Sequence, residues 1–265
     1  MRQENSAFIS FGKANSGLIF DDSENQVYPI RYYNVINGSG VTLNPENSYY
    51  GFVYNGNVTI NRKWLSSLEL NKDMYFCLSG EFTFAAHSLG SCILIEVLDK
   101  SYYKESNFKA YATFGGPIED KGRLKYIDGC TDSLLISPVK KGQPCLNHLH
   151  FPDNINQTQH THPTHRIGIV ASGYGECITP FGNLPLSPEM IFVIKSWDGV
   201  YYDKGLDGEM YPIGQHAFQT FTEPMNVIAF HPDSDFGPED EFHPMINRTI
   251  VGGISANKIK DIMTK

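Results

Sequence analysis

Helical periodicity is scarce in this sequence, and this constrains the fold more than any other feature. An apolar residue every three to four positions, the mark of an amphipathic helix, is seldom sustained. Short runs rich in valine, isoleucine, phenylalanine and tyrosine recur instead, separated by glycine, asparagine, aspartate and proline. These runs lie at 51–60, 73–84, 92–98, 166–180, 190–194 and 225–230. The pattern predicts an all-β protein, built as an antiparallel sandwich or barrel.

The chain also repeats itself. Residues 68–78 match residues 184–194 at a constant offset of 116, and residues 79–95 match residues 213–229 at an offset of 134. The two offsets differ by 18 residues, which places an insertion in the second copy at 195–212. Two matches in the same order, both on strand-like segments, indicate an ancient duplication.

Composition excludes several classes of function. The chain has 265 residues, enough for one large domain or two small ones, and carries a net charge of −8 with scattered lysines and arginines. A nucleic-acid partner is therefore not expected. There is no apolar run long enough to span a membrane and no apolar signal-peptide core, so we expect no membrane contact. Five cysteines without a CxxC pair indicate free thiols in a reducing cytoplasm.

The segment QHTHPTHRIGIV contains the strongest candidates for functional residues. His160 and His162 lie two positions apart, and on a strand this spacing points both side chains to one face. Neutral imidazole binds iron, zinc, manganese, copper and nickel, so the pair provides half of a metal site. By itself an HxH pair is weak evidence, but further strand-like segments surround it. They are CLNHLHFP before it, and RIGIVASGYGEC, PEMIFVI and GQHAFQTF after it.

The order of these segments resembles the cupin fold. Cupins carry a first motif, G-x5-HxH-x3,4-E-x6-G, and a second, G-x5-PxGxxHxxxN. HTHPTHRIGIVASG fits the first from its HxH to Gly173, and PIGQHAFQT fits the second, one residue short, with Pro212, Gly214 and His216. The resemblance covers about residues 130–232 and extends weakly, through the repeat, back to about residue 40. It implies double-stranded β-helix (jelly-roll) barrels, with two cupin domains in tandem.

The resemblance and the repeat together imply four regions. Residues 1–40 are expected to be irregular with one or two edge strands, 41–125 to form a first barrel, 126–251 a second barrel, and 252–265 a tail with a short helix. In the repeat, Phe82 aligns with His216 and Ile93 aligns with Val227. His87 is the only histidine in the first 147 residues. The first barrel is therefore expected to be a scaffold without a metal site.

The family resemblance implies that His160, His162 and His216 bind a divalent metal ion, foremost Fe(II), with zinc, manganese and nickel also compatible. The usual glutamate ligand falls by spacing on Arg166, which stays protonated and has no lone pair to offer. Three-histidine sites occur in the gentisate, salicylate and thiol dioxygenases, where an arginine often holds the substrate carboxylate. Arg166 is thus predicted to be a substrate anchor, and the alternative is a salt bridge at the barrel mouth.

The sequence leaves the roles of three other histidines open. His165 has the opposite parity to the HxH pair, but Pro163 makes a regular strand doubtful there. It could act as a metal ligand, as a catalytic acid–base or supporting group, or lie at the surface; we predict a catalytic role beside Arg166. His148 and His150 offer an alternative pair, but no glycine turn follows at the right spacing. A packed or pocket-lining role is expected for them.

The insertion, KSWDGVYYDKGLDGEMYP, is predicted to be either a lid over the pocket or a surface hairpin. Tyr201 and Tyr202, together with Phe218 outside the insertion, are predicted to bind substrate. A carboxylate ligand could come from Asp198, Asp203, Asp207 or Glu209. The segment HPDSDFGPEDEFHP at 231–244 lacks the spacing of an EF-hand and is expected to be an acidic loop covering the barrel end.

Three functions remain at this point. The first is an Fe(II) dioxygenase acting on a small carboxylate-bearing substrate. The second is a metal-dependent isomerase, epimerase or lyase acting on a sugar or organic acid. The third is a cupin that binds a ligand without catalysis. Each takes a small molecule as partner, and exposed edge strands would also favour a homodimer.

Overall fold

The structure is a computed structural model of the chain. It describes residues 2–12, 14–37, 41–62, 65–87, 89–98, 112–138, 142–233, 250–251, 254–255 and 258–259. Within these ranges the regular elements are strands, apart from the short 3-10 turn Ile127–Gly129. None of the described helical segments is long and apolar enough to cross a membrane. Most of the predicted tail helix and most of the acidic segment at 231–244 lie outside the described residues.

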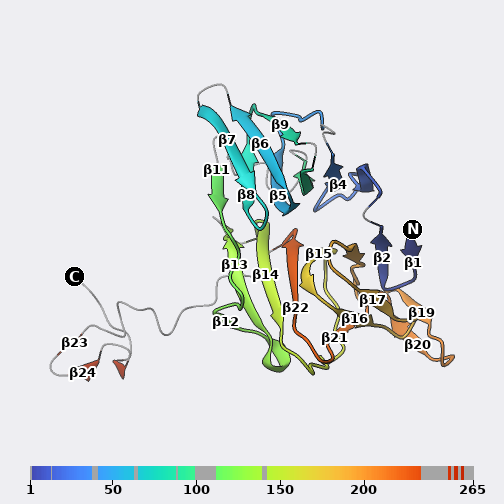
Figure 1. Cartoon of the computed structure of the whole chain (residues 1–265). Helices are drawn as coiled ribbons and strands as arrows, with labels where there is room; N and C mark the ends of the chain where they lie inside the picture. The colour runs from blue at the N-terminus through green and yellow to red at the C-terminus, as the bar shows by residue number, and fades with distance from the viewer. Residues whose placement is uncertain are drawn as a thin grey trace.

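Two large antiparallel sheets form the body of the molecule (Figure 1). The first has the order β11 (Ala112–Gly115), β8 (Tyr75–Ser79), β5 (Ser48–Asn55), β10 (Ser91–Val97), β4 (Ile30–Ile36), β3 (Gly17–Asp22). The second has the order β1 (Gln3–Glu4), β2 (Phe8–Phe11), β18 (Ile191–Ile194), β15 (Arg166–Gly173), β22 (Met225–His231), β14 (Cys145–Phe151), β13 (Thr131–Ile136), β12 (Leu124–Lys125).

Each large sheet is paired with a small three-stranded sheet that closes it into a barrel. The first small sheet has the order β7 (Leu65–Asn71), β6 (Asn57–Arg62), β9 (Thr83–Ala86). The second has the order β17 (Leu184–Leu186), β16 (Gly175–Ile178), β21 (Ala217–Gln219). Two hairpins are separate: β19 (Tyr202–Lys204) with β20 (Met210–Pro212), and β23 (Ile250–Val251) with β24 (Ile254–Ser255).

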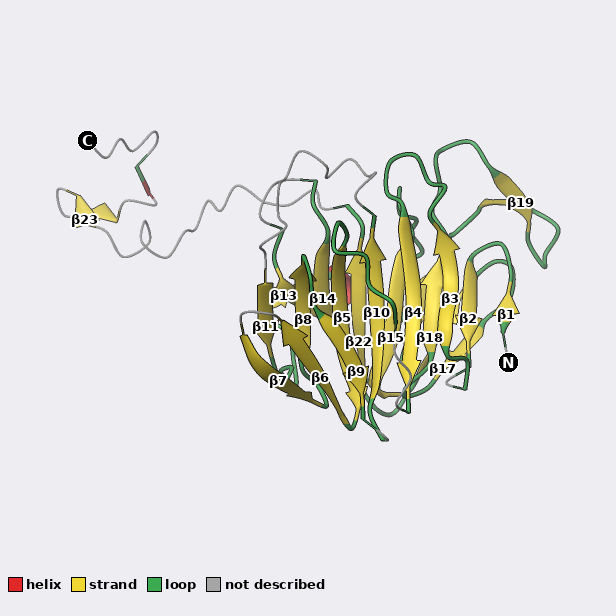
Figure 2. Ribbon diagram, turned by 90° about the horizontal axis from the view of Figure 1, so that it is seen from above, coloured by secondary structure: helices red, strands yellow, loops and turns green. Residues whose placement is uncertain are grey.

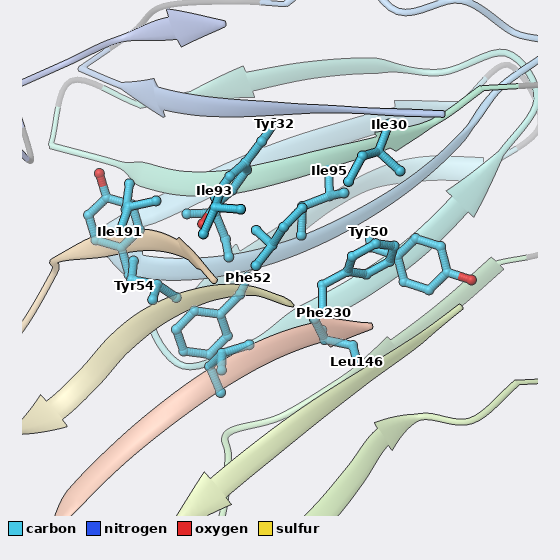
Figure 3. Packing of buried hydrophobic residues seen from close by; sticks show 14 of the residues in the cluster. Ile30, Tyr32, Tyr50, Phe52, Tyr54, Ile93, Ile95, Leu146, Ile191 and Phe230 are labelled. Carbon is cyan, nitrogen blue, oxygen red and sulfur yellow. The ribbon is translucent and has the colours of Figure 1, made fainter. Parts of the chain in front are cut away.

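Successive side chains of each strand point to opposite faces of its sheet, and the apolar ones form three hydrophobic cores. The outer faces of the two large sheets pack against each other, and the layers are seen from above in Figure 2. Ile30, Tyr32, Phe52 and Ile93 of the first sheet meet Ile191 and Phe230 of the second in one buried cluster (Figure 3). The Tyr50 and Phe230 rings lie 5.1 Å apart at this junction. The inner faces form two further clusters, one inside each barrel, so the barrels share a wall but keep separate interiors.

The two barrels have the same topology, in agreement with the duplication inferred from the sequence. The order β8-β5-β10-β4-β3 in one large sheet corresponds to β18-β15-β22-β14-β13 in the other, and β7-β6-β9 corresponds to β17-β16-β21. The 18-residue insertion contains the hairpin β19–β20.

The predicted pairing of Ile93 with Val227 is wrong by one residue. Leu94 pairs with Gly51, and Ala229 pairs with Gly168 at the equivalent place, so β10 and β22 correspond at an offset of 135. Ile93 faces the shared core, whereas Val227 faces the interior of the second barrel. A slip of one residue moves every side chain of a strand to the other face, which a gapless match could not detect.

The expectation for residues 1–40 also needs correction. This segment contains four strands, β1 to β4, rather than irregular structure with one or two edge strands. β3 and β4 belong to the first large sheet, whereas β2 pairs with β18 in the second. The first barrel therefore begins well before residue 41. The early strands of the chain are short apolar runs such as FISF in β2 and GLIF in β3, which the surrounding turn residues concealed.

Two glycines at equivalent positions lie under aromatic rings. A methyl group on Gly168 would come within 2.4 Å of the Phe192 ring, and one on Gly51 within 2.2 Å of the Phe76 ring. Gly168→Ala is therefore expected to lower the free energy of unfolding by about 2 kcal/mol, because the Phe192 ring must move within a packed core. Urea denaturation measures this. Ser172→Ala, on an exposed position of the same strand, is the control and should change stability by less than about 0.5 kcal/mol. Equal stability of both variants would contradict the packing described here.

Candidate metal centre

The three histidines predicted to bind metal lie together inside the second barrel. His160 and His216 form an isolated antiparallel bridge, in which each backbone N–H donates to the other residue's carbonyl at 2.9 and 3.0 Å. His162 follows on the same face. The ring centroids are 4.5 Å apart for His160 and His216, 5.0 Å for His160 and His162, and 5.3 Å for His162 and His216. One ring nitrogen from each residue lies within 4.8 Å of the others.

Backbone carbonyls orient two of these rings. His160 Nδ1 lies 2.9 Å from the carbonyl oxygen of Thr158, and His216 Nδ1 lies 2.8 Å from that of Gly214. Each Nδ1 must donate its proton to the carbonyl, which leaves the lone pair on Nε2. Gly214 has a φ of 72°, and a Cβ there would come within 2.0 Å of the Lys195 carbonyl oxygen. Glycine is therefore required at the turn that presents His216.

The ring electrostatics favour metal binding over protonation. Burial lowers the pKa of His216 to about 3, and proximity to His160 adds to this effect. Burial lowers the pKa of His162 still further, with the Arg166 guanidinium as the next cause. Both imidazoles are neutral at pH 7 and keep the lone pairs that a metal ion needs. The donor set therefore fits a divalent ion, with no carboxylate in the cluster found among the described residues.

A small cavity of about 30 Å³ opens beside the histidines. Its walls are mostly apolar and include Leu149, Phe151, Phe192 and Ile194. Phe218, predicted to bind substrate, also lines the cavity, and its ring packs edge-on against His216 with centroids 5.5 Å apart. The space holds only a few atoms beyond the ion, so a ligand must be small or must displace side chains.

Arg166 lines the same cavity but already has an anionic partner. Its Nη1 donates to Asp233 Oδ1 at 2.7 Å and also contacts Thr164 Oγ1. Burial raises the pKa of the Asp233 carboxyl, but the guanidinium and the Thr164 hydroxyl outweigh this and lower it. Arg166 Nε is buried and has no hydrogen-bond partner among the described residues. The structure thus contains the salt bridge and, on the same side chain, an unused donor.

One histidine of this cavity is not predicted from the sequence. His231, at the end of β22, lines it, and burial lowers its pKa to about 3, with Arg166 contributing. The signal lay in the alternation of MNVIAFH, where Val227, Ala229 and His231 share the inward face. The sequence predicts an acidic loop from residue 231 onward, whereas His231 is the last residue of β22.

His165 does not join the metal cluster. Its Nδ1 accepts the backbone N–H of Ser196 at 2.8 Å, so in the neutral ring the proton is on Nε2, which faces Asp22 Oδ2 at 3.7 Å. Neither nitrogen then offers a free lone pair to a metal. Of the roles considered for His165, that of metal ligand is excluded in this arrangement, and the side chain lines a second cavity instead.

The insertion forms a hairpin that projects from the body of the molecule (Figures 1 and 2). Tyr201 and Tyr202 are 64% and 49% exposed and do not line the histidine cavity. The four candidate carboxylates are also exposed and outside the metal cluster; they are Asp198, Asp203, Asp207 and Glu209. Trp197 contacts the site, because its backbone N–H donates to the His162 carbonyl at 2.8 Å. These positions favour the surface hairpin over the lid.

His148 and His150 occupy the opposite face of β14 from the cavity. Both contact Asn226 Oδ1, at 2.8 and 2.9 Å, and both are buried. Their packed role agrees with the expectation.

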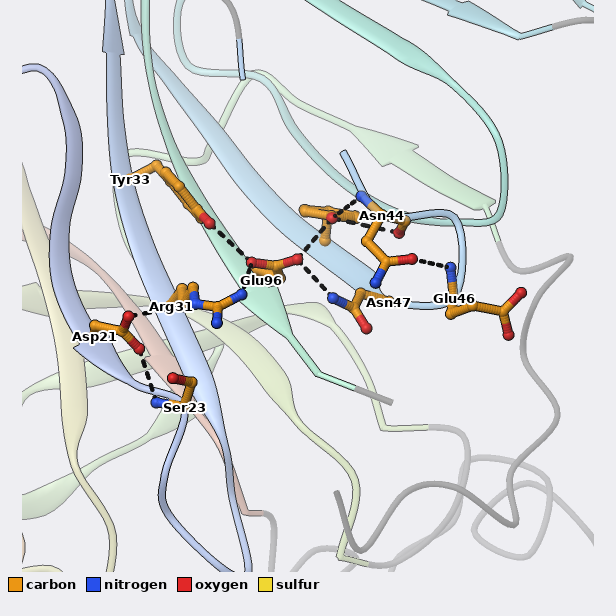
Figure 4. Close-up of polar contacts among 9 residues, drawn as sticks. Asp21, Ser23, Arg31, Tyr33, Asn44, Glu46, Asn47 and Glu96 are labelled. Atoms are coloured by element: carbon orange, nitrogen blue, oxygen red, sulfur yellow. Dashed lines mark hydrogen bonds and ion pairs between the residues drawn. The ribbon is translucent and has the colours of Figure 1, made fainter. Parts of the chain in front are cut away.

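The first barrel has no equivalent histidines. Phe82 occupies the place of His216, and its ring packs edge-on against Tyr49 at 5.5 Å. Glu96, at the place of His231, is buried and fully engaged with Tyr33, Tyr49, Asn47 and Arg31 (Figure 4). Phe82 and this hydrogen-bonded carboxylate thus take the places that His216 and His231 have in the second barrel.

The pKa values of the second barrel predict its acid sensitivity. His216 and His231 stay neutral in the folded state down to about pH 3 but take up protons near pH 6.5 when unfolded. The unfolded state then binds more protons, so stability is present above pH 6.5 and is lost as the pH falls towards 3. Asp132 has the opposite effect on stability. Burial raises its pKa from 3.8 to about 6, so between these two pH values the folded state binds the extra proton and is stabilised by acid.

Burial lowers the pKa of His162 as well, so three histidines act against Asp132. The net expected result for the metal-free protein is a loss of about 2.7 kcal/mol of unfolding free energy per pH unit between pH 6 and 4. Urea denaturation at a series of pH values measures it. A His231→Gln variant should show a shallower slope. Stability that is constant or increases on acidification would show that these rings are not buried in neutral form.

Comparison with known proteins supports the fold. No protein-family model matches the sequence, and no curated protein matches it either. Many solved structures are similar to this chain, among them the following three. A Pseudomonas aeruginosa protein with the provisional name glyoxylate-induced protein has a TM-score of 0.60 at 10% identity, covering 90% of this chain and 93% of its own. A cupin 2 conserved barrel domain protein from Leptotrichia buccalis has a TM-score of 0.52 at 11% identity, and the match covers 88% of this chain and 92% of that protein. Salicylate 1,2-dioxygenase from Pseudoaminobacter salicylatoxidans, solved with gentisate, has a TM-score of 0.52 at 9% identity, and the match covers 84% of this chain and 73% of that enzyme.

Proposed function

Because the chain has the cupin fold, we propose that it is a metal-dependent enzyme, and specifically an Fe(II) dioxygenase acting on a small carboxylate-bearing substrate. The observation that carries the proposal is the cluster of His160, His162 and His216. It brings three imidazoles together, with no carboxylate among the described residues of the cluster, beside a cavity that also contains Arg166. When bound, Fe(II) would supply the activation of oxygen that such a reaction requires.

The protein's own residues would do the rest. Thr158 and Gly214 hold two ligand rings in the tautomer that presents Nε2. Arg166 would bind the substrate carboxylate through its unused Nε, while Asp233 keeps the side chain in place. Apolar walls exclude bulk water and strengthen this charge interaction. The narrow cavity favours a short organic acid.

The similarity to salicylate 1,2-dioxygenase lends support at the level of fold. Neutral imidazoles also bind zinc, manganese and nickel, so an isomerase, epimerase or lyase using such an ion as Lewis acid is the alternative.

The test is elemental analysis of anaerobically purified protein, followed by oxygen uptake with a panel of small carboxylic acids. We expect near-stoichiometric iron and oxygen consumption with at least one acid. Zinc, manganese or nickel without oxygen uptake would support the alternative. No metal after reconstitution with any of these ions would overturn both.

A further inference from the structure

A second cavity lies beside the histidine site, where the first barrel meets the second. Its volume is about 150 Å³, room for several water molecules. Residues of the first sheet and its turn form one wall, among them Asp22 and Ile30. The other wall comes from three segments of the second barrel, which contribute Pro163–His165, Ser196 and Pro232. The metal site does not account for this cavity.

His165 is fixed as a donor in this wall. The Ser196 N–H occupies Nδ1, so Nε2 carries the proton. Burial lowers the pKa of the ring and keeps it neutral. Phe20 packs edge-on against it with centroids 5.6 Å apart. The ring orientation is therefore set from two sides, and Nε2–H has no acceptor within hydrogen-bond distance among the described residues.

Asp22 supplies the acceptor opposite. Its Oδ2 accepts a hydrogen bond from Asn25 Nδ2 at 3.0 Å and lies 3.7 Å from His165 Nε2, too far for a direct hydrogen bond. Its Oδ1 has no partner among the described residues. The neighbouring Asp21 lies on the other face of β3, where it pairs with Arg31. Donor and acceptor thus face each other across a gap that a third group can bridge.

The chemistry of this pair selects the bridging group. A hydroxyl accepts from Nε2–H and donates to the carboxylate, which satisfies both. An ammonium ion has no lone pair and would leave Nε2–H unsatisfied. A carboxylate ligand would be repelled by Asp22. Apolar surfaces of Val27, Ile30 and two prolines complete the walls, and these suit the C–H groups of a short carbon chain.

We propose that this cavity is a binding site for a small neutral polyhydroxyl compound, in which one hydroxyl bridges His165 Nε2–H and the Asp22 carboxylate. The site is separate from the metal centre, since its ligand is uncharged and touches none of the three metal histidines. Thr164 lines this cavity and contacts Arg166, which lines the other, so the two ligands would lie side by side.

The test is saturation-transfer NMR with glycerol, erythritol and xylitol on metal-free protein. In His165→Asn the amide oxygen can still accept the Ser196 N–H, but the Nε2–H donor is lost. Asp22→Asn removes the charge with little change in shape. Asp21→Asn is the matched control, because it makes the same change one residue away and outside the cavity. We expect binding of at least one polyol, about tenfold weaker in His165→Asn and Asp22→Asn and unchanged in Asp21→Asn.

Equal binding in all four proteins would show non-specific association and overturn the proposal. So would the absence of polyol binding to the folded wild-type protein, or displacement of the polyol by acetate at equal concentration. The measurement requires neither metal nor turnover, so its failure would leave the proposed metal enzyme standing, and the reverse also holds.

Discussion

His216→Ala is expected to weaken binding of the divalent ion by more than about 100-fold, since loss of even an outer partner of a metal-binding histidine changes affinity by about 10–100-fold. His216 is the most buried of the three ligands and the one that joins the two motif segments, through its bridge with His160. Activity should fall with metal content. Equilibrium dialysis with Fe(II) under anaerobic conditions and with Zn(II) measures the effect.

A second variant separates loss of a ligand from loss of structure. His216→Phe places in the second barrel the residue that the first barrel has at the equivalent position, where Phe82 packs well. It should lose the metal while keeping the thermal unfolding transition cooperative. His87→Ala, at an exposed histidine of the first barrel, is the control and should bind metal as the wild type does. Unchanged metal content in both His216 variants would remove the basis of the proposed function.

The metal histidines could be found from the sequence because their placement depends on local rules. Spacing of two puts His160 and His162 on one face of an extended segment, and the second motif brings His216 to the strand beside them. The repeat correctly aligned Phe82 with His216 as equivalent positions of the two barrels, because no insertion separates the matched segments at that point. It failed at Ile93, where a single residue in the following turn changed the register.

The other features of the site depend on contacts distant in sequence. Arg166 meets Asp233 because β15 and β22 pair side by side, and nothing in either segment announces that partner. Asp22 reaches His165 only because the first sheet packs against the second barrel. The sequence leaves the role of His165 open for the same reason: its tautomer is set by Ser196, which follows four intervening strands.

The second large expected effect concerns Arg166 and Asp233, whose variants should change KM for a carboxylate substrate in opposite directions. Arg166→Met should raise KM for a carboxylate substrate by about 100-fold with kcat little changed, because a charge-assisted hydrogen bond in a dry cavity contributes about 1.5–3 kcal/mol to binding. Asp233→Asn should lower KM, since it removes the anion that competes for the guanidinium. Steady-state kinetics on the acid identified by oxygen uptake measures both.

The opposite signs decide between the two interpretations of Arg166. If its only role is the salt bridge, each variant breaks the same pair, and both should lose stability while KM stays constant. Both side chains are largely buried, at 14% and 10% exposure, so breaking the pair should lower the free energy of unfolding by about 3 kcal/mol in either case. Stability therefore cannot separate the two roles, but KM can. A KM that rises in Arg166→Met and falls in Asp233→Asn requires the guanidinium to bind substrate, with Asp233 positioning it and limiting its affinity.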